Sequence, residues 1–123
     1  MKRKLRIFKC KLFHYKTIRK VENVLGFKLR DSQILYIFDN DRHIMMGGRA
    51  NGKTLSHQLK LILSYKEKPI DFNSASDTIV FTDFFASSAN SQREYMRWYL
   101  SELRQLYDKC KLANIKVREI KWQ

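Results

Sequence analysis

The sequence predicts a small α/β fold: three layers, in which a parallel sheet of about three strands has helices on both faces, preceded by an N-terminal helical segment. From residue 31 onward, short apolar or β-branched runs alternate with amphipathic helical patterns. Such alternation favours a parallel sheet with helical crossovers. The length of 123 residues suits one domain. We expect residues 1–30 to form a basic segment with a helix, and residues 31–123 to form the α/β module.

The N-terminal part combines a high positive charge with one clear helical pattern. Leu5, Ile7 and Phe8 fit either a short strand or no ordered element. A helix near residues 14–25 is predicted, with Gly26 as its C-terminal stop. The apolar residues at helical spacing that predict it are Ile18, Val21, Val24 and Leu25.

The middle of the chain predicts two helices separated by a strand and a loop. Asp31 is the expected N-cap of the first helix, and the turn-forming residues 39–41 end it. Residues 43–46 predict a buried strand, and residues 47–52 a loop. Residues 53–65 predict the second helix, with one apolar face made of Leu55, Leu59, Ile62 and Leu63.

The C-terminal part predicts a strand, a long helix and a last strand. Residues 66–77 are a polar connection, and the β-branched residues 78–82 are a strand. Asn90 or Ser91 caps a helix that runs to about Leu112, and residues 115–122 alternate as a strand does. The apolar stripe of this helix is Met96, Tyr99, Leu100, Leu103, Leu106, Tyr107 and Cys110.

The charge balance indicates a polyanionic partner. Lys and Arg number 25 against 12 Asp and Glu, a net charge of +13, which favours nucleic acid first and an anionic membrane second. No apolar run approaches the length of a membrane span, and the basic start lacks the apolar stretch of a secretory signal. Cys10 and Cys110 are expected to be reduced thiols, with a disulfide between them as the alternative.

One motif carries specific chemistry. Residues 47–54 match the Walker A pattern G-x-x-x-x-G-K-[ST] between a predicted strand and a predicted helix. Backbone amides of such a loop and the following helix N-terminus cradle phosphates, the lysine reaches the β- and γ-phosphates, and the hydroxyl binds Mg²⁺. The alternative is a glycine-rich surface turn. The expected nucleotide-binding residues are Gly47, Gly48, Arg49, Ala50, Asn51, Gly52, Lys53 and Thr54, with Thr54 as the Mg²⁺ ligand.

With these residues the chain resembles the N-terminal half of the ATPase domain of phage terminase large subunits and related helicases, which are P-loop NTPases. In that family a glutamine upstream of the phosphate loop contacts adenine, and Gln33 matches it; a solvated helix glutamine is the alternative. Residues 79–92 are similar to the family's second strand, which leads through small polar residues into a helix near DNA. The resemblance covers residues 27–123 and implies a P-loop-like module that binds ATP and Mg²⁺.

The departures from the family concern hydrolysis. Its ATPase domains are about twice this length and continue to a Walker B strand ending in Asp-Glu, which this chain lacks. Asp83 is the nearest substitute as a catalytic or metal-site residue, and a loop carboxylate is the alternative; Glu119 is weaker. No arginine finger is evident, although Arg49 inside the loop is placed to touch a phosphate or a DNA backbone, with a solvated loop tip as the alternative. Binding of ATP does not need the missing half, whereas fast hydrolysis does. Either a partner protein or an oligomer completes the site, or the protein does not hydrolyse ATP.

Basic residues on the predicted long helix suggest a nucleic-acid face, with a merely solvated helix surface as the alternative. They are Arg93, Arg97, Arg104, Lys109 and Lys111. Trp98 is placed to stack on a base or to sit at a protein interface. His14, His43 and His57 show no metal-ligand spacing.

Two functions follow from this sequence. The first is an ATP-binding module associated with nucleic acid, DNA rather than RNA, with weak or partner-dependent hydrolysis. The second is a non-catalytic basic protein of phage type that binds, and inhibits or remodels, a host nucleoprotein complex. A nucleotide kinase is a minor third, because no lid segment is evident. Each implies a cytoplasmic location (the host cytoplasm if phage-encoded) and no membrane partner.

Overall fold

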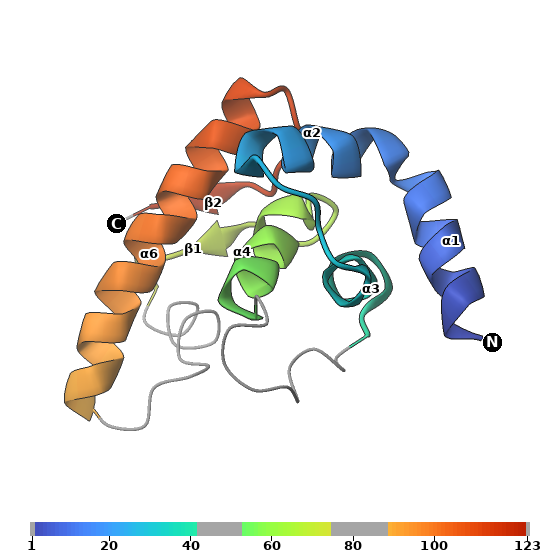
Figure 1. Cartoon of the computed structure of the whole chain (residues 1–123). Helices are drawn as coiled ribbons and strands as arrows, with labels where there is room; N and C mark the ends of the chain where they lie inside the picture. Colours follow the sequence, from blue (N-terminus) through green and yellow to red (C-terminus); the bar gives the residue numbers. More distant parts are fainter. Residues whose placement is uncertain (1, 42–52, 75–88, 123) are drawn as a thin grey trace.

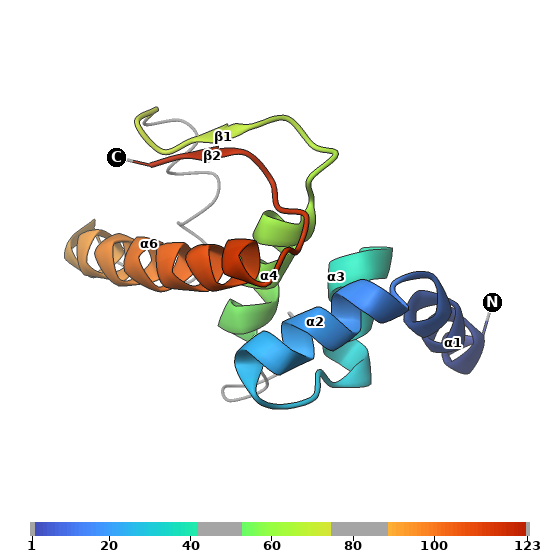
Figure 2. The same cartoon turned by 90° about the horizontal axis from the view of Figure 1, so that it is seen from above.

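The computed structural model describes residues 2–41, 53–74 and 89–122, with side chains in the last range described from Arg97 onward. Their elements are the helices α1 (Arg3–Phe13), α2 (Tyr15–Leu25), α3 (Asp31–Asp39), α4 (Lys53–Leu63) and α6 (Ala89–Leu112), and the strands β1 (Ile70–Asp71) and β2 (Ile120–Lys121). Helix α4 lies between α3 and α6 (Figure 1). The strands run along one side of α4 and α6 (Figure 2).

The predicted three-layer α/β fold is wrong. The part of the chain that the structure describes is mostly helical and holds one sheet, in which β1 and β2 pair in parallel with Ile70 opposite Ile120. The alternating residues 115–122 give only a two-residue strand, because their partner β1 is equally short and is followed at once by a turn at Phe72 and Asn73. The strands predicted at 43–46 and 78–82 lie outside the described residues.

The basic N-terminal region is more helical than the sequence predicted. Residues 3–13, for which a short strand or no order was expected, form α1, and a break at His14 separates it from α2. Ile7 and Cys10 of α1 pack on the core, while Leu5, Phe8 and Leu12 stay exposed. The predicted stop of α2 is confirmed, because Gly26 takes the left-handed conformation (φ 82°) that glycine adopts without strain.

The remaining helices agree with the sequence pattern apart from details at their ends. Helix α3 begins at Asp31, and Arg30 rather than Asp31 is its N-cap. It ends at Asp39, as predicted, with Asn40 in the left-handed conformation. The apolar stripe of α6 is confirmed where side chains are described: Tyr99, Leu103, Leu106, Tyr107 and Cys110 are buried.

Helix α4 is the centre of the core. Leu59 and Ile62 are fully buried, and they belong to one apolar cluster with residues from α2, α3, α6 and both strands. Ser56, His57 and Gln58 are buried as well, so α4 is enclosed on more than its apolar face. The position of α4 therefore depends on both polar and apolar contacts with its neighbours.

Candidate phosphate site and basic surfaces

Helix α4 begins at the residues that the motif predicts to bind phosphate. Lys53 and Thr54 form its first turn, and both side chains are half-buried. An α-helix of 11 residues has a positive dipole end at this point. The rest of the motif, Gly47, Gly48, Arg49, Ala50, Asn51 and Gly52, lies outside the described residues, as do His43 and Asp83.

The first turns of α4 are held against α6 by two polar contacts. His57 Nδ1 and the Tyr99 hydroxyl form a hydrogen bond between buried side chains. Gln58 Nε2 donates to the Tyr99 carbonyl oxygen at 3.4 Å. His57 lies one helical turn after Lys53 on the same face of α4. Sequence spacing carries no signal for this pair, because its members belong to helices far apart in the chain.

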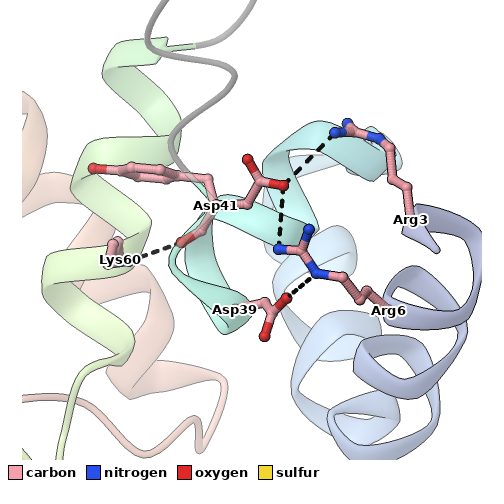
Figure 3. A network of polar contacts seen from close by, with 6 residues as sticks. Arg3, Arg6, Asp39, Asp41 and Lys60 are labelled. Atoms are coloured by element: carbon pink, nitrogen blue, oxygen red, sulfur yellow. Dashed lines mark hydrogen bonds and ion pairs between the residues drawn. The ribbon is translucent and has the colours of Figure 1, made fainter. Parts of the chain in front are cut away.

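The chain enters residues 42–52 from an anchored end of α3. Arg6 Nε contacts Asp39 at 2.7 Å and Arg6 Nη2 contacts Asp41 at 3.2 Å, with Arg3 at 3.7 Å from Asp41 (Figure 3). From α4, Lys60 Nζ donates to the Tyr36 carbonyl oxygen at 2.8 Å, the Lys60 contact that Figure 3 draws. Lys60 Nζ also bonds Asn40 Oδ1. Asp41 is thus held to α1, and Tyr36 and Asn40 are held to α4.

Gln33, the candidate for adenine contact, has a local structural role. It is buried, and its Oε1 accepts a hydrogen bond from the Arg30 backbone N–H at 2.9 Å. This contact satisfies an amide at the start of α3, as a glutamine at the third helical position does in a capping box. Gln33 is therefore not the solvated helix glutamine that the sequence offered as the alternative.

The candidate nucleic-acid residues of α6 lie on two sides of the helix. Arg97 and Arg104 are exposed and two turns apart, and Lys111 continues their row by two turns more. Lys109 is exposed about 140° around the axis from Arg104, on the side of the half-exposed Trp98. The Arg104 guanidinium lies 5.7 Å from the Trp122 ring centre. Arg93 belongs to α6, but its side chain is not described.

Both cysteines are buried free thiols. Burial raises the pKa of Cys110 to about 11 and raises the pKa of Cys10. Among the described residues, no group of three His, Cys, Asp or Glu side chains is placed to hold a metal ion. No helix of the described chain has the length and apolar character needed to cross a membrane.

Comparisons with protein-family models, with curated proteins and with solved structures find no match to this chain.

Proposed function

We propose that this protein binds ATP and Mg²⁺ through residues 47–54 and acts in association with nucleic acid, with hydrolysis that is weak or dependent on a partner. The observation that carries the proposal is the start of α4 at Lys53, directly after the glycine-rich sequence. The proposal stands on this motif and this helix start. It does not require the three-layer sheet.

The chemistry of these residues supports the proposal. Helix N-termini bind phosphate because their first amides lack partners within the helix and the dipole favours negative charge. Lys53 in the first turn is a cation at that end, and the Thr54 hydroxyl beside it is a suitable Mg²⁺ ligand. The contacts of His57 and Gln58 with Tyr99 hold this turn in place. Fixed binding groups lose less entropy when a ligand binds.

Calorimetric titration of the purified chain with ATP and Mg²⁺ tests the proposal, using Lys53→Ala and the control Lys68→Ala. Both variants lose one lysine, and Lys68 is exposed in the connection between α4 and β1. We expect saturable binding by the wild type and the control, and at least a tenfold loss in Lys53→Ala, a difference of about 1.4 kcal/mol or more. Circular dichroism verifies that all three fold. Equal ATP affinity in Lys53→Ala would refute the proposal.

A second candidate function, a non-catalytic protein that binds a nucleoprotein complex, is favoured by the basic row on α6. Among the residues that the structure describes, the cations of this row (Arg97, Arg104 and Lys111) form no ion pair, so their charge is available to an anionic partner. This function predicts that the double variant Arg97→Glu/Arg104→Glu abolishes binding to labelled duplex DNA and to a nucleoprotein complex. Lys53→Ala would then have no effect on this binding. The matched control is Lys4→Glu/Lys121→Glu, which reverses two charges outside the row.

A further inference from the structure

We propose that a groove at the C-terminal end of α4 binds single-stranded nucleic acid, with three lysines contacting phosphates and three exposed aromatic rings stacking on bases. The groove has a volume of about 720 Å³ and lies between the α1–α2 junction, the end of α4 and the connection from α6 to β2. Its cations are Lys16, Lys20 and Lys116, and its exposed rings are Phe13, Tyr15 and Tyr65. The proposal rests on the nucleic-acid part of the proposed function and is independent of ATP binding.

The charge of the groove fits a polyanion. The three lysines come from two elements that are distant in sequence, and none of the described residues that line the groove is Asp or Glu. All three side chains are exposed, so they contact solvent rather than the core. Lys20 also links the two walls, since its Nζ donates to the Asn114 carbonyl oxygen at 3.2 Å. A row of cations without neighbouring carboxylates attracts a phosphate backbone.

The exposed aromatic side chains of the groove favour a nucleic-acid strand whose bases are unpaired. Phe13, Tyr15 and Tyr65 are 80%, 58% and 46% exposed, respectively. Large apolar rings that share one recess in this way indicate an interaction site. In a duplex the flat faces of the bases are stacked on each other, whereas a single strand offers them to aromatic side chains.

Cations already lie beside these rings. The Lys116 and Lys66 ammonium groups are 5.4 and 5.9 Å from the centre of the Tyr65 ring, and the Arg19 guanidinium is 6.0 Å from that of Tyr15. A base stacked on either ring would therefore carry its phosphate close to a positive charge. This combination of stacking surface and cation is the one that binds single strands without regard to sequence.

The groove lies at the opposite end of α4 from Lys53 and Thr54, the described residues of the proposed ATP site. Lys53 and Thr54 start α4, whereas Leu63 at the other end of the helix lines the groove. Eleven residues of α-helix span about 16 Å. Figure 1 shows these ends of α4 with the body of the helix between them.

Fluorescence anisotropy with a labelled oligothymidylate of about 20 nucleotides tests the proposal. We expect Tyr65→Ala to weaken binding roughly tenfold through lost stacking. The control Phe8→Ala removes another exposed ring, one outside the groove, and is expected to change affinity less than about twofold. Equal affinities of Tyr65→Ala and Phe8→Ala would overturn the stacking role.

Salt titration of the same probe tests the lysines. For single strands, log K falls with log salt by about 0.7 for each phosphate neutralised. The variant Lys16→Gln/Lys116→Gln should therefore reduce the slope by about 1.4. Lys4→Gln/Lys121→Gln, which removes two exposed lysines outside the groove, should leave it unchanged. An identical slope in the two variants would overturn the proposal.

Competitors separate the possible occupants. Unlabelled single strand should displace the probe at the lowest concentration; displacement at equal or lower concentration by a duplex of the same length or by polyglutamate would refute the assignment. If Arg97→Glu/Arg104→Glu abolishes oligonucleotide binding while the groove variants do not, the groove proposal fails and the proposed function stands. Loss of ATP binding in Lys53→Ala, with unchanged oligonucleotide affinity, supports two separate sites.

Discussion

The His57 imidazole and the Tyr99 hydroxyl are hydrogen-bonded inside the protein, with ring centres 5.6 Å apart and both side chains buried. Because the pair joins α4 to α6, it connects the helix that begins within the Walker A-like sequence to the helix that carries the basic row. A buried polar group that loses its partner is costly. The fixed position of α4 relative to α6 therefore depends on this bond as well as on apolar packing.

Tyr99→Phe should lower the free energy of unfolding by about 1–2 kcal/mol, since it leaves His57 Nδ1 buried without this partner. Urea unfolding followed by circular dichroism measures the change. Tyr15→Phe is the matched control, because the Tyr15 hydroxyl contacts only the exposed Arg19 among the bonds described for it and should change stability by less than about 0.5 kcal/mol. Similar losses in both variants would mean that the buried bond contributes nothing specific.

The ion-pair network at the end of α3 should also contribute to stability. Arg6 bridges Asp39 and Asp41, and Asp41 is only 15% exposed. We expect Arg6→Met to lower the urea midpoint of unfolding, and by more than the control below, because one guanidinium serves two carboxylates. The control Lys11→Met breaks the more exposed pair with Asp31 and should cost less than about 0.5 kcal/mol. Urea unfolding at low and high salt measures both changes.

Salt provides the decisive comparison for this network. If the Arg6 contribution is electrostatic, the difference between wild type and Arg6→Met should shrink at 1 M salt, where charges are screened over about 3 Å. A loss of stability that is independent of salt would instead indicate that the Arg6 side chain acts through its apolar stem.

Several elements were predictable because their signals are local. The apolar stripe of α6 repeats over many turns, and Gly26 marks the end of α2 by a conformation that depends on one residue. The start of α4 at Lys53 was likewise predictable from the motif and the apolar face that follows it. Such elements can be predicted from the spacing of apolar residues and from the residues at their ends.

The remaining elements depend on contacts that sequence spacing does not record. Helix α1 was not predicted because its apolar residues do not form one buried face. Ile7 and Cys10 pack on the core, whereas Phe8 and Leu12 are exposed. Strand β1 has two residues, too few for an alternating pattern. The polar pair His57–Tyr99 and the lysines of the groove meet only after helices distant in sequence pack together.

The pH dependence of stability should include a contribution from His14. Its ring is stacked on Phe38 with centres 4.4 Å apart, and burial lowers its pKa from the ordinary 6.5. The unfolded chain therefore binds a proton at His14 more readily than the folded chain does. The contribution of His14 to the free energy of unfolding is complete above pH 6.5. It is lost progressively as pH falls from there through the lower, folded-state pKa.

His14→Phe isolates this contribution, because it retains a stacked ring and removes the titrating group. Urea midpoints at pH 7.5 and pH 5.0 should differ less in the variant than in the wild type. His57 and His43 are unchanged in the variant, so the comparison isolates the effect of His14. A pH dependence as large in His14→Phe as in the wild type would show that His14 does not contribute.

The role of Gln33 can be separated into its capping and ligand-binding parts. Its Oε1 accepts a hydrogen bond from the Arg30 N–H, so Gln33→Ala should lower the free energy of unfolding by about 1 kcal/mol, as the loss of a helix cap does. If capping is its only role, ATP affinity measured by calorimetry well below the melting temperature should change less than about threefold, or roughly 0.6 kcal/mol. Ser32→Ala, beside it in the same turn, is the control for stability. A large loss of ATP affinity without a loss of stability would contradict the capping role and assign Gln33 to the adenine ring.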